Sequence, residues 1–307
     1  MPSAATRFRF AHLSDCHLGP LPKVSIRQLM GKRLTGWSNW HWGRNTKLNM
    51  HVQEAVLEDL KKERVDHIVC SGDICNLGLS AEWAGARNFL EELSKPEKVT
   101  FVPGNHDAYC PGSLEGLLEA LGPYASKSFP FVQIRESVAF VGLSTAVPTP
   151  PLCASGELGF EQLRSLKTIL EQLADKALIK VIVLHHPPLP SLGGWRRGLR
   201  DASELELLLK AFDIDLVLYG HNHYAYISFL DNQKNKIPLV GAPSAFMVSH
   251  QAKKIPGYHI ISIQMRENKS WEIYAETKFW TEKGIISKTP LLLSSRFSEK
   301  IFGWPCK

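Results

Sequence analysis

The sequence predicts an α+β protein whose first part is similar to an α/β fold and whose later part is rich in strands. Apolar runs of strand length alternate with apolar stripes at helical spacing through about the first 220 residues, as in βαβ units. After Tyr219 the runs are short and are separated by Asn, Lys, Pro and Gly. Apolar residues make up 44% of the 307 residues, enough for a sizeable core. No apolar stretch reaches the roughly 18 residues of a membrane span.

Five apolar runs predict the strands of the first part. They are residues 7–13, 67–71, 99–102, 180–184 and 216–219. Three stripes at spacings of three and four residues predict amphipathic helices. The stripes are Leu48, Val52, Ala55, Val56 and Leu60; Leu163, Leu166, Leu170 and Leu173; and Leu205, Leu208, Leu209 and Phe212. The third helix opens with a capping-box pattern, Ser203-Glu204-Leu205-Glu206.

The strand-rich part follows Tyr219, and we expect it to pack as a second half on the first. Its predicted strands are residues 225–230, 237–240, 259–264 and 271–276. Because no repeat, low-complexity tract or linker interrupts the chain, we predict one domain over residues 1–277. For residues 278–307 the pattern is irregular and predicts only a C-terminal tail.

The cysteines and the N-terminus favour a reduced, cytoplasmic location. Six cysteines are scattered without CxxC spacing, and Cys16 lies between two candidate ligands, where a disulfide would disturb the site. The first nine residues are short and polar and lack the apolar core of an export signal.

The net charge of +6 is concentrated in the segment from Gly19 to Val52, which contains no Asp or Glu. Its cations and tryptophans are Lys23, Arg27, Lys32, Arg33, Arg44 and Lys47, with Trp37, Trp40 and Trp42. Such a segment suits an anionic partner, including peripheral contact with the inner face of an anionic membrane. An ordinary solvated loop with a few aromatic side chains packed onto the body explains the pattern equally well.

Short motifs of Asp, His, Asn and Gly follow all five strands of the first part. They are Asp15-Cys16-His17, Gly72-Asp73, Gly104-Asn105-His106-Asp107, His185-His186 and Gly220-His221-Asn222-His223. Because the carboxyl ends of strands in an α/β sheet converge on one crevice, we expect these side chains to meet. Imidazole and carboxylate ligands suit Mn, Fe, Zn, Co or Ni, and the lack of thiolates argues against a structural zinc.

Two pairs of candidate ligands are spaced two residues apart, Asp15 with His17 and His221 with His223. On an extended segment such pairs point to one side, so both members can face a metal. The glycines at 72, 104 and 220 are expected to permit the sharp turns that deliver the ligands.

The five motifs in this order resemble those of the calcineurin-like metallophosphoesterase superfamily. They extend from Asp15 to His223, about two thirds of the chain. The resemblance implies a four-layer αββα sandwich of two mixed β-sheets flanked by helices. It also implies two divalent or mixed-valence metal ions and a phosphoester hydrolase of the phosphodiesterase type, in which a metal-bridging hydroxide attacks phosphorus.

Within the family pattern each candidate ligand has a place. Asp15, His17, Asp73 and His223 bind one metal, and Asp73, Asn105, His185 and His221 bind the other, so Asp73 is the bridging carboxylate. His106 is not a ligand but would protonate the leaving oxygen or stabilise charge in the transition state. Asp107 would orient His106, although a turn-forming aspartate is an alternative. We expect His186 to support its loop.

The substrate is less well defined than the chemistry. Residues 185–190 and 199–202 look like those of bacterial class III cyclic-nucleotide phosphodiesterases, so we expect a phosphorylated small molecule. UDP-2,3-diacylglucosamine pyrophosphohydrolases, which act on a lipid-linked nucleotide, are an alternative. One branch of them usually has Arg where His106 stands here, but the Trp-rich basic segment would suit their acylated substrate.

Two further hypotheses come from other functional classes. A DNA or RNA nuclease would share these motifs, but the chain lacks the large extra domains usual in repair nucleases, and its basicity is modest. We therefore expect no stable nucleic-acid complex. A catalytically idle scaffold is disfavoured because every ligand and His106 are present.

Overall fold

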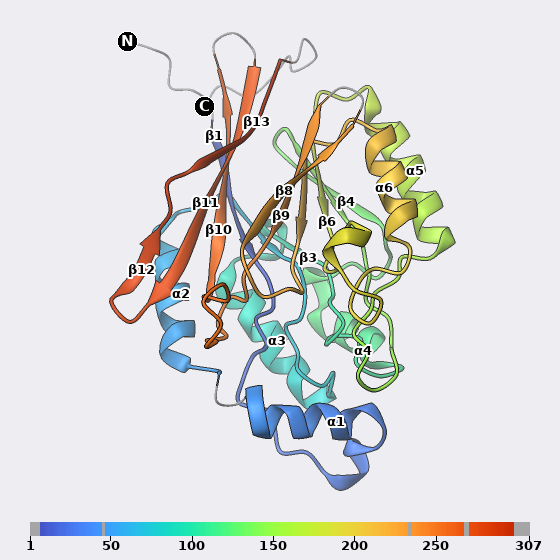
Figure 1. The fold of residues 1–307 in the computed structure, drawn as a ribbon, viewed down its shortest axis with the longest axis vertical. Helices are drawn as coiled ribbons and strands as arrows, with labels where there is room; N and C mark the ends of the chain where they lie inside the picture. Colours follow the sequence, from blue (N-terminus) through green and yellow to red (C-terminus); the bar gives the residue numbers. More distant parts are fainter. Residues whose placement is uncertain (1–6, 45–46, 233–234, 267–269, 298–307) are drawn as a thin grey trace.

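The structure is a computed structural model that describes residues 7–44, 47–232, 235–266 and 270–297. Two β-sheets pack face to face, and helices cover the outer face of each sheet, as Figure 1 shows. The predicted αββα sandwich of two mixed sheets is confirmed.

The first sheet has seven strands and places β1 near its middle. Its order is β12-β11-β10-β1-β2-β3, and β13 pairs with β11. The bounds are β1 (Arg7–Leu13), β2 (His67–Cys70), β3 (Val99–Phe101), β10 (Gly257–Met265), β11 (Ser270–Thr281), β12 (Gly284–Ser287) and β13 (Leu291–Phe297). β1, β2 and β3 run parallel, whereas β10 pairs with β1 in antiparallel register.

The second sheet has six strands in the order β4-β5-β6-β7-β9-β8. The bounds are β4 (Phe131–Arg135), β5 (Val138–Gly142), β6 (Ile179–Val183), β7 (Leu216–Tyr219), β8 (Tyr226–Asp231) and β9 (Lys236–Gly241). β5, β6, β7 and β9 are parallel, and the edge strands β4 and β8 are antiparallel to their neighbours.

Helices cover both outer faces of the sandwich, except for the first one, which lies at one end of the molecule (Figure 1). Their bounds are α1 (Lys32–Asn39), α2 (Met50–Lys62), α3 (Ser80–Leu93), α4 (Ser113–Leu121), α5 (Phe160–Ala174) and α6 (Ala202–Ala211). The buried faces of α2, α3 and α4 pack on the first sheet, and those of α5 and α6 on the second. A third apolar cluster, which includes Phe10, Phe140 and Ile261, fills the space between the sheets.

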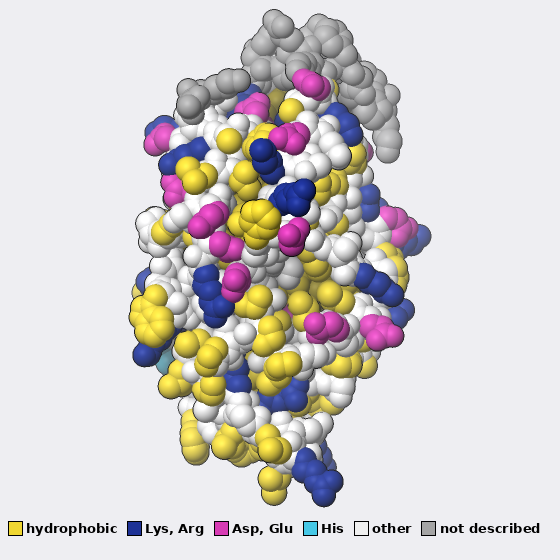
Figure 2. Space-filling model, turned by 90° about the vertical axis from the view of Figure 1, so that its right-hand side faces the viewer, with side chains coloured by type: hydrophobic (Ala, Val, Ile, Leu, Met, Phe, Trp, Pro, Cys, Tyr) yellow, Lys and Arg dark blue, Asp and Glu magenta, His cyan; other side chains and the backbone are white. Residues whose placement is uncertain are grey.

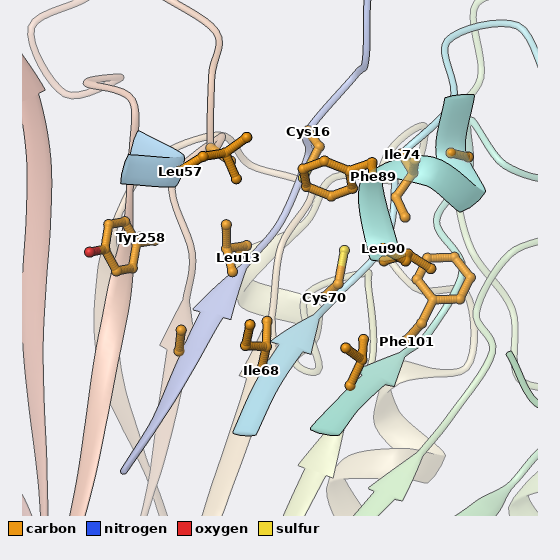
Figure 3. Packing of buried hydrophobic residues seen from close by; sticks show 14 of the residues in the cluster. Leu13, Cys16, Leu57, Ile68, Cys70, Ile74, Phe89, Leu90, Phe101 and Tyr258 are labelled. Atoms are coloured by element: carbon orange, nitrogen blue, oxygen red, sulfur yellow. The ribbon is translucent and has the colours of Figure 1, made fainter. Parts of the chain in front are cut away.

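The packing on the outer face of the first sheet follows from the parallel strands. Leu13, Ile68 and Phe101 point from β1, β2 and β3 toward Leu57 of α2 and Leu90 of α3, as Figure 3 shows. A strand that is buried on both faces has apolar side chains at nearly every position, so its sequence is a continuous apolar run. This pattern predicted β1, β2 and β3. The same packing fixes the carboxyl ends of the three strands at one edge of the sheet.

The strand-rich part of the chain is integrated into both sheets, and not packed on the first half as we expected from the sequence. β8 and β9 extend the second sheet beside β7, whereas β10 and β11 continue the first sheet from β1. The expected boundary at residue 277 falls inside β11, and β12 and β13 follow it. Residues 298–307 lie outside the described residues.

The described helices include none that is long and apolar enough to cross a bilayer. The five cysteines within the described residues are all free thiols, and Cys16, Cys70 and Cys75 are buried.

Candidate metal centre

The predicted site residues come together where β1, β2, β3, β6 and β7 end. Asp15, His17, Asp73, Asn105, His106, Asp107, His185 and His221 are buried there, and His223 is partly buried. The His221 N–H donates to Asp15 Oδ2 at 2.8 Å, across a separation of 206 residues. The ring of His185 reaches the Ser71 carbonyl oxygen at 2.7 Å. These contacts tie the ends of the two sheets into one site.

The first ligand cluster consists of Asp15, His17 and His223. Nε2 of His223 lies 3.1 Å from Asp15 Oδ1 and 3.4 Å from Nε2 of His17. One ligand atom from each residue falls within 4.8 Å of the others, so the three could hold one cation.

The second cluster consists of Asp73, His185 and His221, with Asn105 beside it. Nε2 of His185 lies 3.4 Å from Asp73 Oδ2 and 3.3 Å from Asn105 Oδ1. Nε2 of His221 is buried and has no hydrogen-bond partner among the described residues. A buried polar atom without a partner is costly, and a coordinated cation would satisfy it.

Asp73 lies between the two clusters. Its Oδ2 is 3.8 Å from Nε2 of His17 and 3.4 Å from Nε2 of His185, while its Oδ1 accepts the His106 N–H at 2.7 Å. Burial acts to raise the pKa of Asp73, but His185 and His106 outweigh it and hold the pKa well below its usual range. One ionised oxygen therefore faces both candidate sites.

The charges of the cluster favour a cation at its centre. Burial acts to lower the pKa of His185, yet the Asp73 and Asp15 carboxylates raise it to about 10, so positive charge is stabilised beside them. Burial, together with His186 and His185, keeps the pKa of His221 well below its usual value. A neutral imidazole is the form that binds metals, so the donor set fits a divalent ion.

The ligand segments are sharply turned, which differs from the extended geometry we expected. Asp15, His17, Asp73, His221 and His223 all have positive φ, between 44° and 69°. Left-handed backbone is uncommon in residues other than glycine and concentrates at functional sites. Asp15 and His17 therefore both face the first cluster, whereas His221 and His223 face different clusters. Turns redirect these side chains, so the geometry does not depend on residues two apart sharing a side of a strand.

All three motif glycines are required by close approach, beyond the turning that we expected. A Cβ at Gly72 would lie 2.5 Å from the Gly104 backbone nitrogen. A Cβ at Gly104 would collide with the Asp73 carboxylate, and one at Gly220 would collide with Ser14 Oγ. Of the three, only Gly72 has a positive φ, at 95°. The chain segments that carry the ligands can therefore touch.

His106 lines the cleft, and one ring nitrogen lies within 4.8 Å of ligand atoms of His17 and Asp73. Its Nδ1–H donates to the Asn76 carbonyl oxygen at 2.5 Å, and its ring stacks on Tyr109 with centroids 5.3 Å apart. Because a carbonyl oxygen only accepts, the proton on Nδ1 is fixed and Nε2 is the nitrogen that can exchange a proton.

Asp107 braces the backbone of the site. Its Oδ2 accepts the N–H groups of Gly104 at 2.8 Å and Asp73 at 2.9 Å, and its Oδ1 accepts the Cys75 N–H at 3.0 Å. Burial and the nearby Asp73 raise the pKa of Asp107 to about 7. These contacts correspond to the turn-forming role that the sequence left open for Asp107, and the ring of His106 is bound by the Asn76 carbonyl oxygen.

His186 holds a neighbouring loop. Its Nδ1 lies 2.7 Å from Thr145 Oγ1 and its Nε2 lies 3.1 Å from the Ala154 carbonyl oxygen. Burial and the adjacent His185 lower its pKa to about 3, so the ring is neutral. These contacts are the loop support expected of His186.

A cleft of about 450 Å³ opens over the clusters. Lys32 of α1, Tyr109, Leu152 and Arg197 are among the residues that line it. Sequence reasoning missed Tyr109, Arg197 and Asn76, although the Arg196-Arg197 pair was a visible signal.

The segment 19–52 divides into residues that face the cleft and residues that anchor it. Lys32 Nζ lies 2.5 Å from Thr149 Oγ1 and 4.7 Å from the centre of the Tyr109 ring. Arg33 donates to the carbonyl oxygens of Leu77 at 3.1 Å and Gly78 at 2.9 Å, and therefore holds α1 on the body.

The three tryptophans of this segment differ in the same way. Trp40 is buried and Trp37 packs beside Leu77 and Tyr109, so these two are parts of the body. Trp42 is 84% exposed. The side chain of Arg44 lies outside the described residues.

Comparison with known proteins agrees with this geometry. The family model described as calcineurin-like phosphoesterase matches residues 8–225. A "Probable cyclic nucleotide phosphodiesterase" of Synechococcus is 28% identical over 221 residues, which are 71% of this chain and 78% of that protein. A cAMP/cGMP dual specificity phosphodiesterase of Mycobacterium tuberculosis is 30% identical over 55% of this chain and 53% of its own. A glycerophosphodiester phosphodiesterase of Enterobacter lignolyticus is 31% identical over 53% and 57%.

Solved structures share the fold at low sequence identity. A dimetal phosphatase from Danio rerio has a TM-score of 0.58 and 14% identity, covering 91% of this chain and 98% of its own. A purple acid phosphatase from yellow lupin has a TM-score of 0.55 and 13% identity, covering 94% and 54%. The family match spans most of the chain and includes every ligand motif, so the chain belongs to the calcineurin-like phosphoesterase family and is a metal-dependent phosphoester hydrolase.

Proposed function

We propose that this chain hydrolyses phosphodiesters with two metal ions held by the two ligand clusters. The observation that carries the proposal is the position of Asp73, whose single oxygen Oδ2 lies within 4 Å of a histidine from each cluster. Asp15, His17 and His223 would hold one ion with Asp73, and Asn105, His185 and His221 the other. Two cations bound there would activate a water molecule near neutral pH and polarise a phosphoryl oxygen.

The protein would position its substrate with cations that flank the clusters. Lys32 and Arg197 both line the cleft. The Arg197 guanidinium donates to the His221 carbonyl oxygen at 3.3 Å, which holds it close to the second cluster. Both groups can attract and orient a phosphate anion, so we assign to the segment 19–52 a role in substrate access through Lys32.

His106 would then donate a proton to the leaving oxygen. Nε2 is its exchangeable nitrogen, because the Asn76 carbonyl oxygen fixes the proton on Nδ1. Asp107 acts as a positioning residue. By accepting the Gly104 and Asp73 N–H groups, it holds the segments of Asn105 and Asp73 in register.

The natural substrate we propose is a small phosphodiester such as a cyclic nucleotide. Two relatives are named as cyclic nucleotide phosphodiesterases or as acting on cAMP and cGMP, and a third as acting on glycerophosphodiesters. The cleft of about 450 Å³ is large enough for a ligand of nucleotide size.

The test is a metal measurement combined with a substrate panel. Protein purified without chelator should bind close to two metal ions per chain and hydrolyse bis(p-nitrophenyl) phosphate. The panel compares cyclic nucleotides, glycerophosphodiesters, phosphomonoesters, a nucleotide-lipid pyrophosphate and single-stranded DNA. A preference for phosphomonoesters, or full activity with one metal ion, would contradict the proposal.

A further inference from the structure

We propose that the loops around the cleft form a docking surface for an anionic lipid bilayer. The rim surface consists of the described residues within 19–52, with 145–156, 187–199 and 244–257. Lys32, Leu152, Cys153 and Arg197 from three of these segments line the cleft itself. Burial lowers the pKa of Lys254, which belongs to the fourth segment. The positive charges of Arg197 and Lys47 are close enough to lower this pKa further. Three of the four segments therefore line one opening, and the fourth adjoins the first, because the Val248 N–H donates to the Lys47 carbonyl oxygen at 2.9 Å.

The rim surface carries most of the strongly exposed apolar side chains. Within the described ranges, six large hydrophobic residues are at least 75% exposed. Five of them are on the rim surface, namely Ile26, Met30, Trp42, Leu152 and Trp195. Scattered single apolar residues need no explanation, but their concentration on these segments indicates an interaction surface.

The same surface has a single sign of charge. The sequence of its four segments contains no Asp or Glu, but six Lys or Arg in 19–52, two in 187–199 and two in 244–257. In Figure 2 the lower end of the molecule, where α1 lies in Figure 1, shows hydrophobic and basic side chains and no acidic ones on the face in view. The Arg196 guanidinium also lies over the Trp195 ring, 4.8 Å from its centre.

This combination fits a bilayer better than it fits a nucleic acid. Phosphodiester backbones are bound by cations and polar groups, which gives no reason to expose Ile26 and Met30 beside Lys23 and Arg27. Apolar side chains that enter the headgroup boundary, with Trp at the interface and Lys or Arg toward anionic headgroups, are the pattern of an interfacial protein. Charge complementarity and exposed apolar area therefore select the same partner.

Docking in this orientation would turn the cleft toward the lipid headgroups. Phosphoesters carried in the membrane could then reach the metal centre without leaving the interface. This consequence rests on the proposed function, whereas the docking itself does not and can be measured without turnover.

Co-sedimentation with vesicles tests the docking surface. The full chain should bind vesicles of phosphatidylglycerol and phosphatidylcholine, and bind phosphatidylcholine alone much more weakly. The apolar variant Ile26→Ser/Met30→Ser/Trp42→Ser should lower the partition coefficient at least about tenfold. The charge variant Lys23→Gln/Arg27→Gln/Arg196→Gln should lower it by roughly fivefold for each cation removed.

A matched control uses exposed apolar residues away from the rim, Leu207 of α6 and Ile134 of β4. Leu207→Ser/Ile134→Ser should bind vesicles as the unchanged protein does. All three variants should keep the unfolding temperature and the hydrolysis of bis(p-nitrophenyl) phosphate, because none touches the cleft.

Three outcomes would overturn the docking surface. They are no binding of the unchanged protein to anionic vesicles, equal loss in the control variant, and binding that the charge variant loses but the apolar variant keeps. Binding to a DNA duplex that competes with vesicles at equal salt would assign the surface to a nucleic acid and also overturn it. Vesicle binding without hydrolysis of any phosphodiester would instead contradict only the proposed function.

Discussion

Replacing His106 with alanine should separate proton transfer from metal binding. The imidazole donates from Nδ1 to the Asn76 carbonyl oxygen at 2.5 Å, and its backbone N–H, which the substitution keeps, donates to Asp73 Oδ1 at 2.7 Å. Metal content should therefore stay near that of the unchanged protein. The free energy of unfolding should fall by about 1–3 kcal/mol, because the Asn76 carbonyl oxygen loses its donor.

The loss of activity should depend on the leaving group. General acid catalysis contributes typically 10²–10⁴ in rate, which is about 3–5 kcal/mol of activation free energy. His106→Ala should lower kcat by this amount for a cyclic nucleotide, whose alkoxide leaving group needs a proton. It should lower kcat far less for bis(p-nitrophenyl) phosphate, whose leaving group needs little protonation.

Steady-state kinetics on the two substrates, with metal analysis of the same protein sample, measure both effects. An equal fall on both substrates would show that His106 stabilises charge or position and is not the proton donor. Loss of bound metal would show that the imidazole is a ligand. Either result refutes the reasoning from the Nδ1 contact.

Three further changes test the site and the fold. Asp73→Asn should remove most of one metal ion and part of the other and cost several kcal/mol of transition-state stabilisation, measured by metal analysis and kcat; near-normal turnover with two ions bound would contradict the bridging role. Lys32→Ala should raise KM for an anionic diester by roughly tenfold at unchanged stability, whereas Arg33→Ala should lower the free energy of unfolding by about 1–3 kcal/mol, because the Leu77 and Gly78 carbonyls lose their donor. The reverse pattern in kinetics and denaturation would show that the two residues are misassigned. Burial lowers the pKa of His67 to about 3 and that of His259 to about 4. Below a pH of about 6.5, which is the usual histidine pKa, the unfolded chain binds more protons than the folded protein does. The free energy of unfolding should therefore fall as the pH drops from 7 to 5, by about 2 kcal/mol for each of these two histidines. Denaturant unfolding that gives the same stability at both pH values would contradict this.

The strands that carry the ligands could be predicted because their signal is local. The parallel strands are covered on both faces, so each is a continuous apolar run, and β7 (Leu216–Tyr219) was predicted to the residue. The antiparallel edge strand β4 (Phe131–Arg135) is only partly buried and was not among the predicted elements. The predicted strands after Tyr219 exist, but their distribution over both sheets depends on pairing partners far away in the sequence.

Roles within the site were harder to predict than the members of the site. Residue type and order predicted that His106 and Asp107 belong to the site. Their roles depend on hydrogen bonds to the backbone of neighbouring turns, and the sequence does not show the geometry of those turns. The partner of the His106 ring is a backbone carbonyl, that of Asn76, and such a partner leaves no trace in residue identity. The same holds for Arg33, which binds two backbone carbonyls.

The sequence by itself determined the type of chemistry that this protein can perform. The tertiary structure decided which residues line the cleft where that chemistry takes place. Asp, His and Asn after apolar strands specify hard-to-borderline metal ligands wherever the sheet places them, so the ligand set follows from composition and order. Which cation of the segment 19–52 reaches the cleft, which tryptophan is buried and which loops share the rim are decided by contacts between segments more than 30 residues apart, such as that of Lys32 with Thr149. Local sequence cannot encode these contacts singly, because each depends on the packing of the whole sandwich.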